Sequence, residues 1–368
     1  MTAGEAARRL LLPLTPLYGL GLALRERRLR SGREPVRRLR FPVISIGNLS
    51  TGGAGKTPFT IALAQALTYA GFAIDVLSRG FGRHASSPAR VRPDGTPAEF
   101  GDEPLLIARD AAVPVYVASQ RYEAGLLAES EAPSDVVLKK NVVILSGGRA
   151  APAVEGPAFQ NVSTAHQHPV VHILDDAFQH RQLHRDIDIL LLNRDDWHDR
   201  LLPAGNLREP RRAAMRASVI AIPAGDPELE LDLRAWGWKG PIWRSHRHMD
   251  VPPVSGPVLA FCGIARPGQF FAGLEAAGLR LAGRVPFRDH HPYAPRDLDR
   301  LQAAAHAAGA AALVTTAKDH VRLTALLATF PQDLPLLTAG LRIEIEEESA
   351  ALDWLITRLN SIPPRPPL

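Results

Sequence analysis

A glycine loop between a predicted strand and a predicted helix constrains this chain more than any other feature. The sequence of residues 47–58 is GNLSTGGAGKTP. Phe41 to Ile46 predicts a short buried strand before the loop, and the apolar spacing from Pro58 to Ala70 predicts a helix after it. The order of strand, glycine loop, Lys-Thr and helix is the context of a phosphate-binding P-loop, and it favours an α/β fold.

The residue types of this loop suit a bound nucleotide. Its three glycines let backbone N–H groups close around phosphate oxygens at a helix N-terminus. Lys56 can reach the terminal phosphates, and the Thr57 hydroxyl can ligate Mg²⁺. At position 50 this chain has Ser where the usual P-loop motif has Gly. The competing interpretation of the segment is a glycine turn with a solvated lysine. The predicted ATP-binding residues are Ser50, Thr51, Gly52, Gly53, Ala54, Gly55, Lys56 and Thr57.

A hydrophobic strand that ends in aspartate is the expected partner of a P-loop. Val170 to Leu174 reads VVHIL and is followed by Asp175 and Asp176. Such a strand brings a carboxylate to the Mg²⁺ beside the loop. Many strands end in acidic turns, so this pattern gains its weight from the upstream glycine loop. We therefore predict that Thr57, Asp175 and Asp176 ligate the metal.

The first 40 residues combine an apolar run with a dense cluster of arginines. Leu10 to Leu24 is almost wholly apolar, but it is shorter than the roughly 20 residues that a spanning helix needs. Residues 1–40 contain ten Arg and three Glu, a charge of +7, so residues 41–368 carry −2 of the formal +5. Three interpretations stay open: an interfacial helix held on anionic lipid, a short spanning helix, and a helix packed on the domain with solvated arginines.

The composition of the chain excludes several classes of protein. The body of the chain is close to neutral, so we expect no nucleic-acid partner. Hydrophobic residues make up 46% and charged residues 22% of the chain, which is ordinary for a globular protein. Cys262 is the only cysteine, which excludes an intramolecular disulfide and a cysteine-based zinc cluster. A single cysteine also fits a reducing compartment.

Eight motifs occur in the order seen in one enzyme family. They are GNLSTGGAGKTP at 47–58, LSRGFGR at 77–83, GDEP at 101–104, LDDAFQH at 174–180, LLPAGNLREP at 201–210, GIARP at 263–267, DHHPY at 289–293 and TTAKD at 315–319. Together they resemble the tetraacyldisaccharide 4′-kinases of lipid A synthesis, over about residues 10–345. The resemblance implies transfer of phosphate from ATP, with Mg²⁺, to the 4′-hydroxyl of a tetraacylated glucosamine disaccharide 1-phosphate, which forms lipid IVA. It further implies a monomer at the cytoplasmic face of the bacterial inner membrane, in contact with anionic lipid.

The resemblance also implies a catalytic pair that spacing alone would not identify. Asp102, in GDEP, corresponds to a carboxylate that acts with a histidine as the base, and His290, the first histidine of DHHPY, corresponds to that histidine. The chemistry fits, because a sugar hydroxyl that attacks a γ-phosphate must give its proton to a positioned acceptor. On the residues alone, Asp102 is a surface loop acid, and His290 with His291 is a loop pair or a weak metal site.

Four more residues take candidate roles from their motifs. Glu209 corresponds to an acidic residue near the metal, which adds it to the predicted metal ligands. Arg208 and His180 are expected to contact nucleotide or substrate; a structural ion pair and a satisfied core histidine are the alternatives. Lys318, in TTAKD, fits a capping or pairing role at the start of a helix.

The chain departs from the family pattern in three places. Ala177 and Phe81 stand where the family usually has Gly and Tyr. Residues 134–145 read like the strand before the acidic pair, but a stretch rich in Gly, Ala and Pro separates them from Asp175. We interpret residues 139–166 as an insertion beside that strand.

Alternating short strands and helical runs favour a mainly parallel, P-loop-type sheet flanked by helices, with a second, smaller α/β lobe and an N-terminal membrane-associated helix. ATP and acceptor would meet between the lobes. The predicted units are an apolar anchor and basic collar at 1–40, a P-loop kinase domain at 41–225, a linker or ribbon at 226–257, a C-terminal lobe at 258–350, and a helix end with a Pro-rich tail at 351–368.

Two other functions compete with the kinase. A membrane-recruited P-loop ATPase switch of the partition or septum-site type has a similar loop. That class carries a second lysine where this chain has Thr51, and it has no need of GDEP or DHHPY. A non-catalytic nucleotide sensor is disfavoured by the presence of Lys56, Thr57 and Asp175.

Overall fold

The computed structural model describes residues 10–132, 169–330, 334–363 and 365–366. The predicted insertion at 139–166 lies outside these residues. The strands are β1 (Val43–Asn48), β2 (Ala73–Ser78), β3 (Ala89–Arg90), β4 (Val115–Val117), β5 (Val170–Leu174), β6 (Ile187–Leu191), β7 (Val219–Pro223), β8 (Ile242–Asp250), β9 (Val258–Cys262), β10 (Leu281–Pro286), β11 (Ala312–Thr316) and β12 (Leu336–Ile345). They form one sheet in the order β10-β9-β11-β12-β8-β7-β6-β1-β5-β2-β4-β3.

Most neighbouring strands of this sheet are parallel. Among the strands described, the antiparallel pairs are β8 with β12 and β3 with β4. β1 lies between β5 and β6, and all six of its residues are buried. Burial on both faces is typical of a parallel sheet that is covered by helices. The predicted α/β class with a mainly parallel sheet is confirmed.

Helices cover both faces of the sheet. Ile187, Ile189 and Leu191 of β6 pack with residues of α3 and α12, whereas the intervening Leu190 packs with residues of α7 and α8. The helices are α2 (Thr15–Arg30), α3 (Lys56–Tyr69), α4 (Pro97–Phe100), α5 (Asp102–Asp110), α6 (Arg121–Glu131), α7 (Arg194–His198), α8 (Pro227–Ala235), α9 (Pro267–Ala276), α10 (Pro295–Ala307), α11 (Ala317–Leu323) and α12 (Glu348–Asn360), with 3₁₀ turns at Leu12–Leu14, Arg211–Arg216 and Thr324–Thr329.

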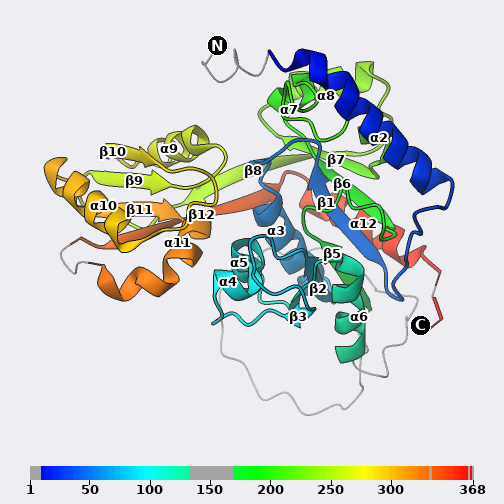
Figure 1. The fold of residues 1–368 in the computed structure, drawn as a ribbon, viewed down its shortest axis with the longest axis horizontal. Helices are drawn as coiled ribbons and strands as arrows, with labels where there is room; N and C mark the ends of the chain where they lie inside the picture. The colour runs from blue at the N-terminus through cyan, green and yellow to red at the C-terminus, as the bar shows by residue number, and fades with distance from the viewer. Residues whose placement is uncertain (1–9, 133–168, 331–333, 364, 367–368) are drawn as a thin grey trace.

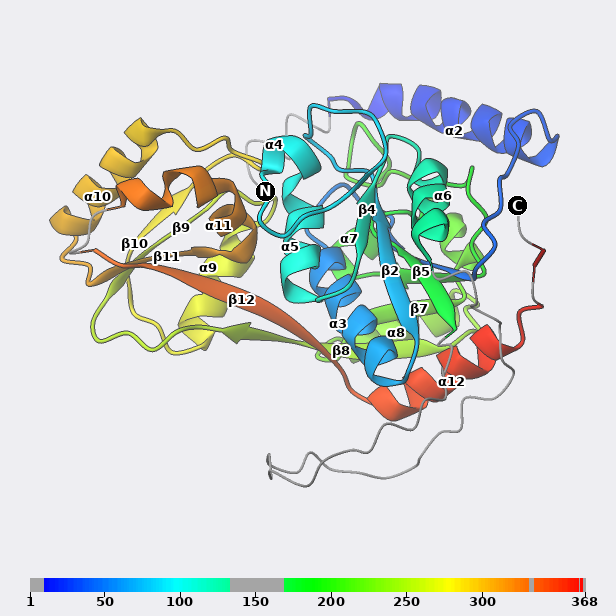
Figure 2. The same cartoon turned by 90° about the horizontal axis from the view of Figure 1, so that it is seen from below.

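Strands β8 and β12 join two parts of the molecule. Their residues Ser245–Asp250 and Gly340–Ile345 pair antiparallel, while β8 begins beside β7 and β12 begins beside β11. Figure 1 and Figure 2 show both strands running between a larger lobe, which holds β1 to β7, and a smaller lobe, which holds β9 to β11 with α9 to α11.

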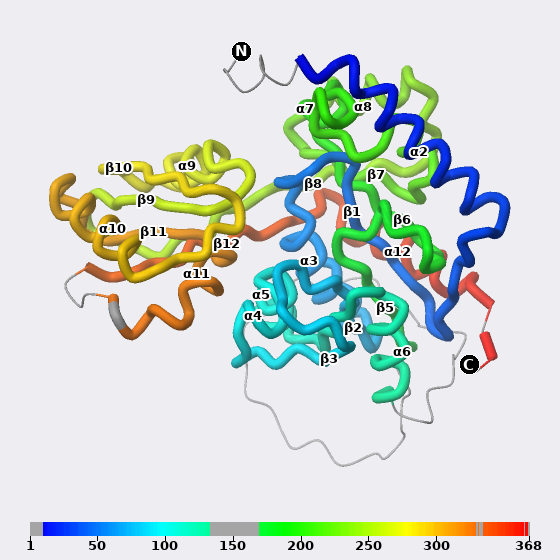
Figure 3. The backbone as a smooth tube through the Cα atoms, viewed as in Figure 1, coloured from blue at the N-terminus to red at the C-terminus, as the bar shows by residue number. Residues whose placement is uncertain are grey.

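After β12 the chain returns to the larger lobe. Leu355 and Leu359 of α12 join the buried cluster that contains Ile44 of β1 and Phe59 of α3. Figure 3 traces this return from the smaller lobe through β12 to α12. The division of the chain into five units stays a prediction.

The N-terminal helix lies on the larger lobe with an apolar surface exposed. The Tyr18 hydroxyl donates to the Arg208 carbonyl and the Arg25 guanidinium donates to the Gln179 carbonyl, both at 2.9 Å. Leu17, Leu20 and Leu24 are 65%, 57% and 50% exposed. None of the helices in the described part of the chain is long and apolar enough to span a bilayer.

Candidate functional site

The loop between β1 and α3 bends through conformations that favour glycine. Gly52, Gly53 and Gly55 have φ angles of +94°, +57° and +79°, in a region that other residues rarely adopt. A Cβ at position 52 would lie 2.9 Å from Ala265 Cβ, and one at position 53 would lie 2.7 Å from Arg266 Cδ. Glycine is therefore needed for the turn and for the close approach of the smaller lobe.

Two cations converge at the start of α3. Lys56 Nζ lies 3.1 Å from Asn48 Oδ1 and 3.5 Å from Asp176 Oδ1. Arg208 Nη2 shares both partners, at 2.6 Å from Asn48 Oδ1 and 2.9 Å from Asp176 Oδ1. Two positive charges beside a glycine loop are suited to a polyphosphate chain.

Asp175 and Asp176 follow β5 directly, but they differ in their electrostatic surroundings. Asp175 is 1% exposed. Its pKa is raised to about 7, first by burial and then by the nearby carboxylates of Glu103 and Asp176. Burial would also raise the pKa of Asp176, but Lys56 and Arg208 outweigh it and hold that pKa below its usual range.

These oxygen donors fit a magnesium ion that is bound together with a nucleotide. Carboxylates and hydroxyls are the ligands that Mg²⁺ prefers, and it usually takes one or two carboxylates together with substrate phosphates and water. The described residues contain no group of three or more His, Cys, Asp or Glu side chains arranged to hold a metal. Thr57, Asp175 and Asp176 thus offer the kind of oxygen donors that a nucleotide-bound Mg²⁺ takes.

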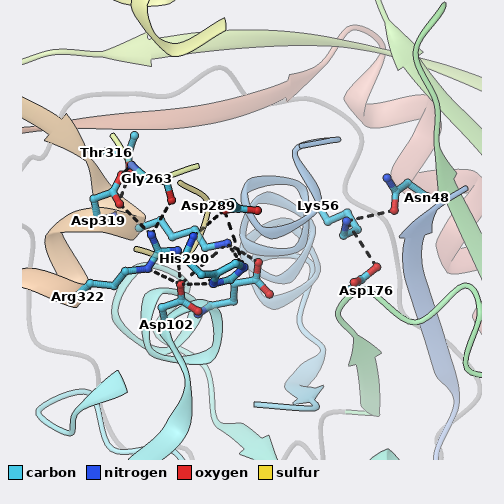
Figure 4. A network of polar contacts seen from close by, with 12 residues as sticks. Asn48, Lys56, Asp102, Asp176, Gly263, Asp289, His290, Thr316, Asp319 and Arg322 are labelled. Atoms are coloured by element: carbon cyan, nitrogen blue, oxygen red, sulfur yellow. Dashed lines mark hydrogen bonds and ion pairs between the residues drawn. The ribbon is translucent and has the colours of Figure 1, made fainter. Parts of the chain in front are cut away.

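The predicted pair of Asp102 and His290 meets across the two lobes. His290 Nδ1 lies 3.2 Å from Asp102 Oδ2, and Arg322 Nε donates to the same oxygen at 2.8 Å. Burial would raise the pKa of Asp102, but the His290 hydrogen bond and the charges of Lys318 and Arg322 outweigh it and keep the pKa low. The carboxylate is thus ionised and directed at the imidazole. Figure 4 shows this cluster together with that of Lys56.

Backbone strain accompanies both clusters. Asp176 has a φ of +45° and His290 a φ of +55°. A residue other than glycine costs about 1–3 kcal/mol in such a conformation and persists only when its surroundings hold it there, which is common at functional sites. From this conformation both side chains make the contacts described above.

One cavity of about 1550 Å³ joins the two clusters. Three predicted site residues do not line it. Ser50 is buried beneath the loop, where its hydroxyl accepts from Asn48 Nδ2 at 2.9 Å. Asp102 is also buried, and His290 lies between it and the cavity. Glu209 is also buried, with its carboxylate 2.6 Å from Arg216 Nη2. The predicted residues that do line the cavity are Thr51, Gly52, Gly53, Ala54, Gly55, Lys56, Thr57, Asp175, Asp176, His180, Arg208 and His290.

His180 contributes a neutral ring to the cavity wall. Burial, and then the positive charges of Arg121 and Arg185, lowers its pKa to about 3. The ring is therefore uncharged at neutral pH. It presents a hydrogen-bonding group without a positive charge.

Charged residues that sequence reasoning missed also line the cavity, and three of them make contacts that bear on the site. Arg121 donates to both backbone carbonyls that follow β5, at 2.8 and 2.9 Å. Arg247 of β8 donates to the Ala54 carbonyl in the glycine loop at 2.9 Å. Glu103 Oε1 accepts from Lys318 Nζ at 2.8 Å, across the lobes. Glu103 belongs to the GDEP motif, whereas Arg121 and Arg247 lie outside every motif and only the fold reveals them.

Comparisons with known proteins point to one family. The family model described as tetraacyldisaccharide-1-P 4′-kinase matches residues 7–360. A tetraacyldisaccharide 4′-kinase of Koribacter versatilis is 37% identical, with 94% of this chain and 97% of the relative covered. Another of Chromobacterium violaceum is 33% identical, with 96% of this chain and 94% of the relative covered.

A solved structure shares the fold. The crystal structure of LpxK from Aquifex aeolicus in complex with ATP matches with a TM-score of 0.68 and 30% sequence identity. The match covers 96% of this chain and 99% of that chain, so it includes both lobes.

Proposed function

Because this chain belongs to the tetraacyldisaccharide-1-P 4′-kinase family, we propose that it transfers the γ-phosphoryl group of ATP to the 4′-hydroxyl of a tetraacylated glucosamine disaccharide 1-phosphate. The product is the lipid A precursor lipid IVA. The observation that carries the proposal to individual residues is that the glycine loop and His290 line the same cavity. A kinase needs its nucleotide and the base that accepts the hydroxyl proton close together in one site.

Residues 51–57 line the cavity and bind the phosphates of ATP. The N–H groups of the glycine loop surround the phosphate oxygens, and Lys56 with Arg208 neutralises the terminal phosphates. Ser50 supports the loop from beneath through its hydrogen bond with Asn48.

Thr57, Asp175 and Asp176 would hold Mg²⁺ beside the phosphates. When bound there, Mg²⁺ offsets the charge that develops on the β- and γ-phosphate oxygens. Glu209, which the sequence also predicts as a ligand, would act only after its ion pair with Arg216 opens. His180 offers a neutral contact to nucleotide or substrate.

His290 is the general base. When Nδ1 carries the ring proton and donates it to Asp102, Nε2 has the free lone pair that accepts the hydroxyl proton. The 4′-oxygen attacks the γ-phosphorus in line, and the new O–P bond forms while the bond to the β–γ bridging oxygen breaks and ADP leaves. The hydroxyl proton passes to Nε2 and then to solvent, and Asp102 orients the ring and stabilises its protonated form.

The chain acts as a monomer on the cytoplasmic face of the bacterial inner membrane. The exposed leucines of α2 and the arginines in its last turn supply the apolar and electrostatic contributions that attachment to anionic lipid needs. Arg25 of the same helix lines the cavity. Attachment through α2 therefore brings the sugar of a membrane lipid toward His290.

The test is a transfer assay with the full chain. It contains γ-³²P-ATP, Mg²⁺ and a tetraacyl disaccharide 1-phosphate in mixed micelles, and the lipid is separated by thin-layer chromatography. We expect labelled lipid and ADP in equal amounts. ATP hydrolysis without labelled lipid would overturn the kinase and favour the membrane-recruited ATPase switch.

A further inference from the structure

Lys318 reaches from the smaller lobe into the site. Its Nζ lies 2.8 Å from Glu103 Oε1 of the larger lobe and 3.4 Å from His290 Nε2. Its side chain is 20% exposed and lines the same cavity as Lys56. Burial would lower its pKa, but Glu103 and then Asp102 outweigh burial and raise it. The ammonium group is therefore charged at neutral pH.

The start of α11 holds Lys318 in place. Thr316 Oγ1 accepts from the backbone N–H of Asp319 at 3.0 Å. The buried carboxylate of Asp319 in turn accepts from the Gly263 N–H and from the Tyr293 hydroxyl, both at 3.0 Å. Lys318 thus emerges from a turn that is tied to the core of the smaller lobe.

Lys318 contacts the ring nitrogen that must face the acceptor. Asp102 and Arg322 both lie against Nδ1 of the ring, at 3.2 and 3.3 Å, so a hydroxyl can give its proton only to Nε2. The hydroxyl oxygen must come within about 3 Å of Nε2, and it lies about 3–3.5 Å from the γ-phosphorus when reaction begins. An ammonium 3.4 Å from Nε2 is therefore within side-chain reach of the γ-phosphate oxygens.

The other cations of the two clusters are held elsewhere. Lys56 and Arg208 both pair with Asp176 at the glycine-loop end. Arg322 is held by the Asp102 carboxylate and does not line the cavity. Of these four cations, Lys318 is the one that lines the cavity beside His290 Nε2.

We propose that Lys318 is a catalytic residue that binds the γ-phosphoryl group from the acceptor side during transfer. This inference rests on the proposed kinase function. Glu103 holds the ammonium between turnovers, and the phosphate oxygens replace Glu103 when ATP and acceptor are bound. Phosphoryl-transfer enzymes use such an additional cation to neutralise the charge on the equatorial oxygens. Because Lys318 comes from the smaller lobe and Lys56 from the larger lobe, transfer requires both lobes.

Kinetics of K318M and K318R in the full chain are the first part of the test. We expect K318M to lower kcat by about 10²–10³-fold, as for the loss of one preorganised donor to a transition state, with little change in KM for ATP or lipid. K318R keeps the charge and should recover part of the loss. Equal kcat in wild type and K318M would overturn the proposal.

Binding of a phosphoryl-transfer mimic is the second part, and it needs no lipid. We expect K318M to leave the Kd of Mg–ADP unchanged and to weaken the complex of ADP with aluminium fluoride by roughly 100-fold. A purely structural role predicts another pattern, in which K318M and E103Q lower Tm alike and weaken both complexes alike. That pattern would overturn the proposal.

The two parts separate this inference from the proposed function. If wild type labels no lipid but K318M still selectively weakens the fluoride complex, the kinase proposal fails and the phosphate contact stands. If K318M does not fold, Lys318→Cys treated with bromoethylamine restores an ammonium at nearly the same reach. Cys262 is buried, so the new thiol is the accessible one. If wild type labels lipid and untreated K318C has the same kcat as wild type, the inference about Lys318 is overturned and the proposed kinase function stands.

Discussion

Two adjacent histidines occupy different environments. His290 lines the cavity and faces Asp102, whereas His291 Nε2 lies 3.0 Å from Asp297 Oδ2 and its ring stacks on Phe287 at 4.5 Å. The residue pattern DHHPY does not distinguish the two, because the distinction comes from the +55° φ of His290. Family resemblance could therefore select the residue, but the contact with Lys318 required the fold.

Substitution of each histidine by glutamine tests this difference. H290Q should lower kcat by about 10²–10⁴-fold, because the glutamine amide cannot take up the proton of the attacking 4′-hydroxyl. Its affinity for Mg–ADP should not change. H291Q is the matched control, with activity retained and Tm lowered through lost packing on Phe287. Equal loss of kcat in the two variants would contradict the assignment of His290 as the base.

The glycine loop permits a second residue-scale test. Gly53→Ala places a methyl at a φ of +57° and against Arg266. The conformational penalty of about 1–3 kcal/mol should raise the KM for ATP by roughly 5–150-fold. Gly268→Ala in α9 is the control, because its Cβ would meet nothing within 4 Å. Similar KM values for both variants would show that the loop tolerates a side chain.

At the scale of elements, local patterns located several strands but not their long-range partners. β5 spans Val170–Leu174 as predicted, and β9 begins at Val258 where the second α/β unit was expected. The pairing of β8 with β12 joins Ser245 to Ile345, and no local pattern encodes a partner so distant. The contacts of Arg121 and Arg247 depend on such pairings and could not be predicted for the same reason.

β5 is also tied to its neighbours by a buried charge cluster. His172 Nδ1 lies 2.7 Å from Asp75 Oδ1 of β2, and its Nε2 lies 3.4 Å from Glu129 Oε1 of α6. Burial would lower the pKa of His172, but Asp75 and Glu129 outweigh it and raise the pKa to about 9. The protonated ring therefore connects β5 with β2 and α6.

This cluster predicts a fall in stability with rising pH. A histidine whose pKa is raised from about 6.5 in the unfolded chain to about 9 contributes stability fully below pH 6.5 and loses it as pH rises through 9. Urea unfolding should show a loss on the order of 3 kcal/mol between pH 6.5 and 9.5. H172Q should be less stable than wild type at pH 6.5, and its free energy of unfolding should fall less than that of wild type between pH 6.5 and 9.5. Equal losses in wild type and H172Q would assign the dependence to other groups.

At the scale of the whole molecule, one surface gathers apolar side chains beside positive charge. The charge distribution could be predicted from the sequence, because the basic cluster is local. Which side of α2 faces outward could not, because that depends on the contacts of Tyr18 and Arg25 with the larger lobe. The result is a leucine-rich surface that borders the cavity through Arg25.

Replacement of the three exposed leucines tests attachment. L17Q/L20Q/L24Q should bind anionic vesicles at least about tenfold more weakly, since each lost apolar contact removes on the order of 1 kcal/mol. The KM for micellar lipid should rise, and Mg–ADP affinity should not. L231Q is the control, because Leu231 is equally exposed, at 68%, but lies on α8. Unchanged vesicle flotation of the triple variant would refute attachment through α2.

The return of α12 to the larger lobe has a consequence for synthesis of the chain on the ribosome. Every predicted ATP-binding residue precedes α12 by almost 300 positions, yet Leu355 and Leu359 complete the apolar core beneath the glycine loop. A nascent chain that ends before residue 348 leaves the part of this core that α12 covers in contact with water. The exposed leucines of α2 emerge early because they lie near the N-terminus. The core beneath the nucleotide site is complete only when residues 348–360 have left the exit tunnel.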